Sequence, residues 1–271
     1  MNARRPPRQY LEPMCGLCNR LRVIDGAVTL AEELGSQLVV LWYADRDLNC
    51  RFEDLYEPLP PPVRFHTLSL PQPVEALSKR LIHGFARRAC DGYMVQFEAE
   101  ALARSGHDFT AFVRQGRTYL KTWSRFHPTP RPFTRFRLQP HLAALLERTT
   151  RGFEQVVGVH IRRTDCQDAI ARSTTEKFIA AMDAELVREP ATRFFLATDD
   201  AREEALFAAR YPGRILTHPK RTRARHRREG IEDAVIDLHA LGRCRTILGS
   251  YASSFSETAV DLCPGGGRYV T

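Results

Sequence analysis

The chain has 271 residues, of which 43% are hydrophobic and 27% charged, and this balance excludes a disordered or low-complexity protein because it supplies enough apolar side chains for a core. The net charge of +8 comes mostly from residues 220–228, which carry six Lys and Arg side chains, so the rest of the chain is nearly balanced. A basic loop on a balanced protein does not by itself indicate binding to nucleic acid.

The longest strongly apolar run, residues 38–44, is far shorter than the roughly 18 to 20 residues that cross a bilayer, which argues against a membrane span. The amino terminus is basic, but no apolar segment of a secretory signal follows it, so we expect a cytoplasmic protein. The seven cysteines form an odd set and are expected to be reduced. Cys15 and Cys18 are a lone C-x-x-C pair without the second pair that a zinc site needs.

The first half begins with a βαβ pattern. An extended stretch and a turn at Gly16 precede residues 18–34, whose apolar side chains recur at helical spacing. Gly35 marks the end of this helix, and the apolar residues 38–42 are expected to form the next strand.

The rest of the first half is less regular. Residues 58–73 contain six prolines and no helical period, which favours an irregular surface segment, whereas residues 74–105 have a helical pattern. The stretch 127–140 is rich in Pro, Arg and Phe and is typical of a linker. We therefore expect one domain over 1–140 and a second over 141–271.

The second half alternates apolar strands with helices. Strands are expected at 155–161, 193–197, 214–216 and 246–248, and helices at 141–149, 175–188, 201–209, 231–242 and 254–262. The apolar residues of the first of these strands do not simply alternate, as expected of a strand buried on both faces. This order predicts an α/β fold with a parallel, doubly wound sheet.

Three of these strands end in polar residues, at 160–165, 198–200 and 249–256. Ligands of open parallel sheets bind beyond the carboxyl ends of the strands, so these residues are expected to meet at one edge. Arg162 and Arg163 supply two permanent cations with several donors each, beside Asp165, which can orient one of them. Such a pair suits a diphosphate.

Ser253, Ser254 and Ser256 stand at the start of an expected helix, where hydroxyl and backbone N–H groups form a natural anion site. Each feature alone also has an ordinary structural role: paired arginines often lie in a solvated turn, and serines or Asp199-Asp200 often cap a helix. The joint placement on neighbouring strand ends favours a ligand site.

Several motifs of other enzymes are missing. The chain has no P-loop lysine motif, no G-x-G-x-x-G and no G-x-S-x-G, which argues against a P-loop NTPase, a standard dinucleotide site and a hydrolase elbow. No isolated Asp-x-Asp follows a strand, and the adjacent Asp199-Asp200 does not match one, so we expect no metal.

The motifs together resemble the fucosyltransferase superfamily, in particular its α1,6- and protein-O-fucosyltransferase branches, which include the rhizobial nodulation fucosyltransferases. The resemblance rests on the order and content of four segments, 16–22, 158–165, 197–200 and 253–256, and the H-x-R-R-x-D element is its most specific part. It implies a GT-B-like fold, with two Rossmann-like domains and a nucleotide-sugar cleft between them. The implied activity is inverting, metal-independent transfer of L-fucose from GDP-β-L-fucose to a glycan or other hydroxyl acceptor.

The resemblance also implies roles for single residues. Arg162 and Arg163 would contact the diphosphate, His160 the nucleotide, and Asp165 would brace the arginines. Asp237 would read the guanine, although a helix-surface acid is its plain alternative. The remaining donor-binding candidates are Gly16, Asn19, Asp199, Ser253, Ser254, Phe255 and Ser256.

The chain departs from the family after the H-x-R-R-x-D element. Several relatives have a Lys there and then a Glu in the acceptor pocket, where this chain has Cys166, Gln167, Asp168 and Ala169. Asp168 is the nearest carboxylate that could replace the missing acid in catalysis. The acceptor and the catalytic base therefore stay open.

Two alternatives remain beside fucosyl transfer. The first alternative is an enzyme of the same fold whose donor is a nucleotide sugar other than GDP-fucose. A non-enzymatic polyanion-binding protein would use the basic loop from Lys220 to Arg228, which could also bring the protein to the periphery of an anionic membrane. A solvated flexible loop is the simpler interpretation, and we expect no nucleic-acid partner.

Overall fold

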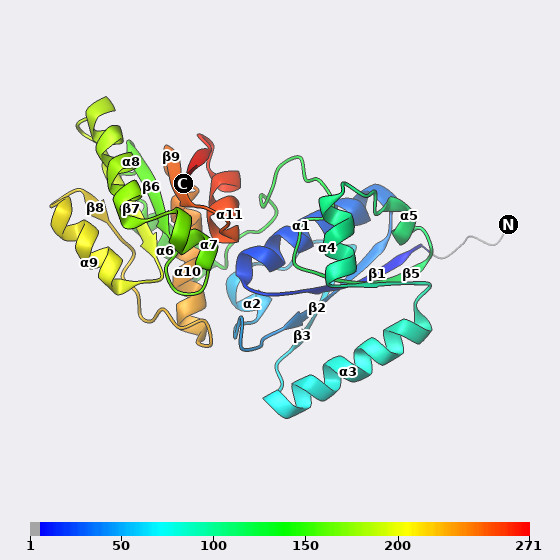
Figure 1. Ribbon diagram of the computed structural model, residues 1–271. Coiled ribbons are helices and arrows are strands. Elements are labelled where there is room, and N and C mark those ends of the chain that lie inside the picture. The colour runs from blue at the N-terminus through cyan, green and yellow to red at the C-terminus, as the bar shows by residue number, and fades with distance from the viewer. Residues whose placement is uncertain (1–5) are drawn as a thin grey trace. The chain divides into compact units, whose positions relative to one another are not determined.

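The computed structural model describes residues 6–271, and the chain divides into two compact units after Arg137 (Figure 1). The second unit, Leu138–Thr271, therefore begins close to the expected boundary at residue 140. The segment 1–5, on which the expectation of no secretory signal partly depends, lies outside the described residues. Among the residues described, no helix is both long and apolar enough to cross a membrane.

The first unit contains a five-stranded parallel sheet in the order β3-β2-β1-β5-β4. Its strands are β1 (Arg8–Pro13), β2 (Gln37–Tyr43), β3 (Val63–Leu68), β4 (Gly92–Val95) and β5 (Arg117–Thr122). Its helices are α1 (Leu17–Leu34), α2 (Phe52–Leu55), α3 (Gln72–Ala89), α4 (Phe97–Arg104) and α5 (Thr110–Val113). As expected, α1 ends at Gly35, whose φ of 59° is left-handed and suits glycine.

The second unit contains a parallel sheet in the order β10-β9-β6-β7-β8. Its strands are β6 (Val156–Ile161), β7 (Arg193–Thr198), β8 (Ile215–Leu216), β9 (Thr246–Ser250) and β10 (Gly267–Val270). Its helices are α6 (Pro140–Thr149), α7 (Gln167–Arg172), α8 (Thr175–Arg188), α9 (Ala201–Arg210), α10 (Arg228–Leu241) and α11 (Ser254–Leu262). Both sheets confirm the expected α/β class.

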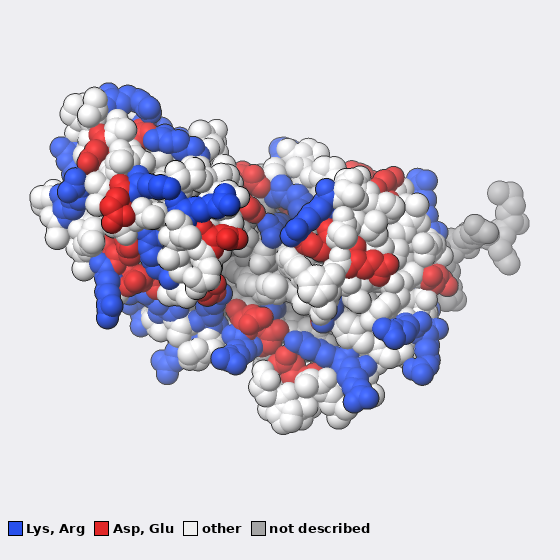
Figure 2. Space-filling model, in the orientation of Figure 1, with Lys and Arg blue, Asp and Glu red and all other residues white. Residues whose placement is uncertain are grey.

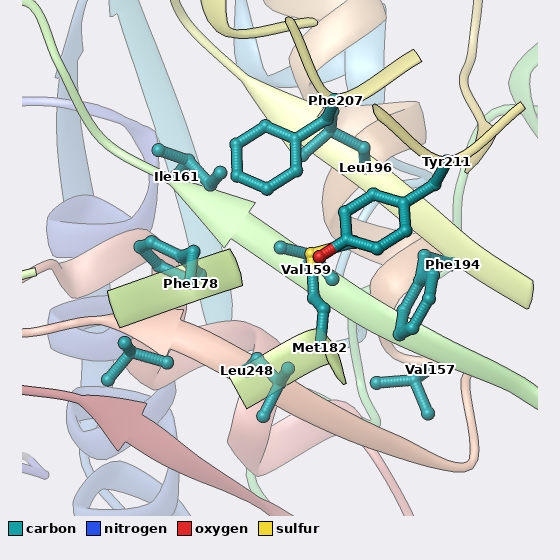
Figure 3. Packing of buried hydrophobic residues seen from close by; sticks show 11 residues of the cluster. Val157, Val159, Ile161, Phe178, Met182, Phe194, Leu196, Phe207, Tyr211 and Leu248 are labelled. Atoms are coloured by element: carbon teal, nitrogen blue, oxygen red, sulfur yellow. The ribbon is translucent and has the colours of Figure 1, made fainter. Parts of the chain in front are cut away.

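The central strand β6 is buried at all six positions, as its continuous apolar sequence indicated. Val157, Val159 and Ile161 of β6 pack with side chains of β7, β9 and the covering helices α8 and α9 (Figure 3). Phe178 and Met182 from α8 are completely buried in this cluster. The core of the second unit thus fixes the direction in which β6 delivers its last residues.

Two expectations for the first unit were wrong. Residues 63–68 form the edge strand β3 instead of an irregular segment, because an edge strand needs hydrogen bonds on one side only and tolerates the prolines that flank it. Residues 92–95 form the edge strand β4 inside a stretch that was expected to be helical throughout. Four residues are too few to show a period of two.

The order of the strands reverses direction at one point in each sheet. In the first unit this point lies between β1 and β5, and in the second between β6 and β9. Helices leave the sheet in opposite directions from such a pair of strands, which opens a crevice at their carboxyl ends. The ends of β6 and β9 carry two of the three polar segments, 160–165 and 249–256, at which a ligand was expected, and the third segment, 198–200, follows β7.

Candidate active site

The backbones at the ends of β6 and β9 are joined by one buried hydroxyl. Ser250 Oγ accepts the N–H of Arg162 at 3.0 Å and donates to the carbonyl oxygen of His160 at 3.2 Å. Gly249 allows α11 to approach the strand, because a Cβ at this position would lie 2.9 Å from the Cβ of Ser256. The two strand ends and the start of α11 therefore form one rigid edge, which we call the rim.

His160 is completely enclosed behind the rim. Its Nδ1 lies 2.7 Å from Ser256 Oγ, and its ring stacks on Phe255 with 4.6 Å between the ring centroids. Burial, assisted by the nearby Arg162 cation, lowers the pKa of His160 to about 3 although Asp199 opposes the shift. The imidazole is therefore neutral at pH 7 and supports α11 without adding charge to the rim.

Arg162 presents a partly exposed cation at the rim. Its Nε lies 3.2 Å from Asp199 Oδ2 and its Nη2 donates to Asp165, and 17% of its side chain is exposed. Within residues 6–271, no contact engages Nη1. Two carboxylates thus hold the guanidinium in place while one of its nitrogen atoms remains available to a ligand oxygen.

Arg163 points into the unit instead. Its Nε lies 2.7 Å from Glu203 Oε1, its Nη1 donates to the carbonyl oxygens of Arg162 and Ser173, and its guanidinium lies over the ring of Phe178. Only 10% of the side chain is exposed. The two adjacent arginines therefore differ: Arg162 faces the rim, and Arg163 ties the end of β6 to α8 and α9.

The two adjacent aspartates also have different roles. Asp199 accepts the backbone N–H of Arg163 at 2.8 Å and the hydroxyl of Thr164 at 2.6 Å, so it shapes the turn after β6. Asp200 is the N-cap of α9 and accepts the N–H of Arg202 at 2.8 Å. The helix-cap interpretation thus applies to Asp200.

The start of α11 completes the anion-binding side of the rim. Ser253 is its N-cap and accepts the N–H of Ser256, while Ser254 at the first helical position is half-buried. Backbone N–H groups of a first helical turn attract anions. Cys166 Sγ lies 3.7 Å from the carbonyl oxygen of Ala252, which connects the start of α7 to this loop.

Asp168 lies in the first turn of α7 and is exposed. Asp168 lies two residues after Cys166, which contacts the loop before α11. Its carboxylate is therefore close in sequence to the rim. The Lys and the Glu that several relatives have in this segment are both absent from residues 166–169 of this chain.

The basic loop differs from the solvated loop that we expected. Most of its cations form ion pairs with acids of α9 and α10 or of the rim: Lys220 with Asp237, Arg221 with Asp233, Arg223 with Glu204, Arg225 with Asp165 and Arg228 with Glu232. The charge that the sequence concentrates here is largely compensated by tertiary contacts. An anionic surface bound through this loop is therefore not supported.

Asp237 and Lys220 form the most buried of these pairs, with 6% of each side chain exposed and 2.7 Å between Nζ and Oδ1. Burial raises the pKa of Asp237 to about 6, although the Lys220 cation opposes this shift. Asp237 is thus an inward carboxylate on α10 and not the helix-surface acid of the plain alternative.

Gly16 and Asn19 belong to the first unit and follow the carboxyl end of β1. Gly16 is the N-cap of α1, and the side chain of Asn19 accepts a hydrogen bond from Arg22. Arg20, with 1% of its side chain exposed, holds this turn through the carbonyl oxygen of Cys15 and the carboxylate of Asp45, each at 2.8 Å. The turn is fixed from inside the unit.

Sequence reasoning missed three residues that the structure adds to the site. Ser250 lies in the polar strand end 249–256 that was expected at the ligand edge, but it was not singled out as a site residue. Glu203 and Arg225 had none, because the segments that carry them reach the H-x-R-R-x-D element only in the folded chain. Among the described residues, no group of three or more His, Cys, Asp or Glu side chains is arranged to hold a metal ion.

No family model and no curated protein matches the chain. Among solved structures, the NodZ α-1,6-fucosyltransferase soaked with GDP-fucose is 18% identical, with a TM-score of 0.66 over 96% of this chain and 94% of that chain; NodZ from Bradyrhizobium gives 0.65. POFUT1 in complex with GDP-fucose is 13% identical, with a TM-score of 0.58 over 98% of each chain. The fold resemblance to fucosyltransferases that the motifs indicated is thereby confirmed.

Proposed function

We propose that this protein is an inverting glycosyltransferase that transfers L-fucose from GDP-β-L-fucose to a hydroxyl group of a glycan, without a metal ion. The observation that carries this proposal is Arg162, a cation held by two carboxylates at the point where the strand order reverses. Solved structures of the same fold contain GDP-fucose or GDP. A diphosphate sugar fits the charge and the donors of the rim.

Arg162 would act on the leaving group. When the bond between the fucose C1 and the β-phosphate oxygen breaks, the electron pair stays on that oxygen and the sugar gains oxocarbenium character. Arg162 and the N–H groups of the first turn of α11 would stabilise the charge that grows on the phosphate. Because this charge is larger in the transition state than in the substrate, the interaction increases the rate more than the affinity.

The acceptor hydroxyl would attack C1 from the opposite face, forming the new C1–O bond and inverting β-L to α-L configuration. Its proton must pass to a base, and Asp168 is the carboxylate that we propose for this role. Asp168 is exposed in the first turn of α7, five residues after Arg163, which leaves room for an acceptor.

Positioning falls to residues behind the rim. Arg163 braces the turn from the inside, and neutral His160 supports Ser256 at the start of α11. Asp237 would accept hydrogen bonds from the N1–H and 2-amino groups of guanine, with Lys220 keeping its carboxylate ionised. Gly16 and Asn19 would border the nucleotide from the first unit.

The experiment is a panel of GDP-fucose, GDP-mannose, GDP, UDP-glucose and UDP, measured by thermal shift and by release of free sugar. We expect GDP to raise the melting temperature and UDP not to, since saturation at one hundred times the dissociation constant stabilises the folded state by about 2.7 kcal/mol. Equal shifts from GDP and UDP, or none from either, would refute the donor assignment. Faster hydrolysis of GDP-mannose than of GDP-fucose would favour the alternative that the donor is a nucleotide sugar other than GDP-fucose.

Metal dependence is tested on the same reaction. Excess EDTA is expected to leave donor hydrolysis and fucosyl transfer nearly unchanged, because Arg162 supplies the charge at the leaving group. Loss of activity with EDTA and recovery with manganese would contradict the arginine mechanism.

A further inference from the structure

Helix α3 turns its polar side toward its own unit. Of its 18 residues only Glu75 and Ala86 are buried, and Lys79 and His83 are half-buried on the same side. Lys79 Nζ lies 2.6 Å from Glu75 and 3.4 Å from Asp45. The helix is therefore held largely by charged groups, where an ordinary surface helix is held by an apolar stripe.

The polar contact continues into the sheet beneath α3. His83 Nε2 lies 3.4 Å from Glu12 of β1 and its Nδ1 lies 2.8 Å from the hydroxyl of Tyr93 on β4, and Lys121 of β5 lies 2.7 Å from Glu12. These interactions fix the rotation of the helix about its axis. The opposite side of α3 is consequently directed away from the sheet.

The outward side carries large apolar residues. Val74, Leu77, Leu81 and Phe85 have exposed fractions of 47, 56, 64 and 70%, rising along the helix. Their separations of three, four and four residues place them in one stripe, since helical residues at these spacings share a face. We call this set the α3 stripe. A monomeric protein seldom exposes a contiguous apolar stripe of this kind without a partner for it.

The exposed charged residues of α3 itself all have one sign. Arg80, Arg87 and Arg88 are exposed on the same helix, and its only acid, Glu75, is buried. Where Figure 1 draws α3, the surface in Figure 2 is white at one end of the helix and blue along the rest. The helix thus presents apolar and cationic groups together and no exposed acid.

We propose that the α3 stripe docks the protein on a membrane surface that contains anionic lipids. Val74, Leu77, Leu81 and Phe85 enter the boundary between headgroups and acyl chains, and the three arginines meet lipid phosphates and carboxylates. The length of the arginine side chains allows their heads to reach the headgroups while their stems lie along the apolar stripe. The helix lies in the plane of the surface and does not cross it.

The charge of α3 favours an anionic membrane over a second copy of the chain as the partner of the α3 stripe. Two α3 helices packed stripe to stripe would bring six arginines together with no exposed acid on either helix, and like charges in contact disfavour association. An anionic lipid surface supplies the opposite charge that the helix lacks.

The experiment measures co-sedimentation of the full chain with phosphatidylcholine vesicles that do or do not contain phosphatidylserine. We expect binding to the anionic vesicles that weakens with salt. Changing Leu77, Leu81 and Phe85 together to Ser should weaken it by about tenfold or more. Changing Arg80, Arg87 and Arg88 to Ser should weaken it by about fivefold for each arginine and abolish the lipid preference.

Matched controls separate the stripe from general effects. Val187→Ser removes an apolar side chain that is 85% exposed on α8, and changing Arg114, Arg148 and Arg202 to Ser removes three exposed charges elsewhere. Both controls should bind like the original chain, and circular dichroism should be unchanged in every variant.

Two results would overturn the proposal. One is failure of the unaltered chain to bind anionic vesicles at low salt. The other is a concentration-dependent dimer, seen by light scattering without lipid, that is lost when the α3 stripe is changed to Ser; this would assign the stripe to a second copy. Donor hydrolysis in solution is expected to be equal in all variants, so the result does not depend on the proposed reaction.

Discussion

The two units place their charged residues in opposite ways. In the second unit the sheet is enclosed by apolar side chains, and the polar groups meet at the carboxyl ends of β6 and β9. In the first unit Glu12, Lys121 and His83 lie between the sheet and α3, and apolar residues of α3 face outward. The comparison shows that similar parallel sheets can use charge either to bind a ligand at an edge or to attach a helix to a face.

The largest effect is expected from Glu12→Ala in the first unit. The substitution leaves Lys121 buried without its carboxylate, and loss of one partner of a buried pair costs about 3 to 5 kcal/mol. Both tryptophans, Trp42 and Trp123, belong to this unit, so urea unfolding followed by tryptophan fluorescence reports it selectively. The exposed acid Glu98 provides the control. If Glu98→Ala lowers the free energy of unfolding equally, the charged groups under α3 do not stabilise the unit more than an exposed acid does.

The second prediction concerns the rim. Arg162→Ala should lower turnover of GDP-fucose by about 10² to 10³, because one donor to the leaving group is lost. The fluorescence-detected unfolding of the first unit should not change. Arg202→Ala, at an exposed arginine of α9, should keep its turnover. Retention of activity by Arg162→Ala would remove the rim from the chemistry.

The third prediction separates the two adjacent arginines. Arg163→Lys keeps the charge beside Glu203 but loses hydrogen bonds to Ser173 and Thr175, so the second unit should lose about 1.5 to 3 kcal/mol of stability. Far-UV circular dichroism during unfolding measures this loss, while tryptophan fluorescence shows that the first unit is unchanged. Turnover should fall less than in Arg162→Ala. A stable but inactive Arg163→Lys would show that both arginines serve the ligand.

The last prediction is the response of the two units to pH, and its sign differs between them. Although burial opposes it, hydrogen bonding to His83 and the Lys121 cation lower the pKa of Glu12 from 4.5 to about 2, so its contribution to stability is present above pH 4.5 and is lost as the pH falls toward 2. Burial raises the pKa of Asp237 from 3.8 to about 6, so its contribution is complete below pH 3.8 and is lost as the pH rises through 6.

Unfolding at pH 7, 5 and 3 checks this pair of signs. Tryptophan fluorescence follows the first unit, and far-UV circular dichroism follows both units, so a change seen only by circular dichroism belongs to the second unit. Asp237→Asn should flatten the response of the second unit between pH 4 and 7 only. If both units lose stability in parallel as the pH falls from 7 to 5, the assignment to Asp237 is wrong.

The sequence by itself determined the alternation of strands and helices in the second unit and the strand ends that carry its polar residues. Its strands there are short continuous apolar runs, which appear when both faces of a sheet are covered. The same reasoning failed for the edge strands β3, β4 and β10, because edge strands of four to six residues carry too little periodicity and are specified by pairing with a neighbour. It also missed the inner strand β5, for which no strand was expected.

Only the tertiary structure decided which way side chains point and what they meet. Arg162 and Arg163 are neighbouring residues of the same type. Because successive side chains of an extended chain point to opposite sides, Arg162 lies at the rim and Arg163 packs against α8 and α9. The loop from Lys220 to Arg228 is basic in sequence, whereas its partners on α9 and α10 compensate it in the fold. Charge is a property of residues, but the free energy that it contributes depends on burial and on the opposite charges that folding brings within hydrogen-bond distance.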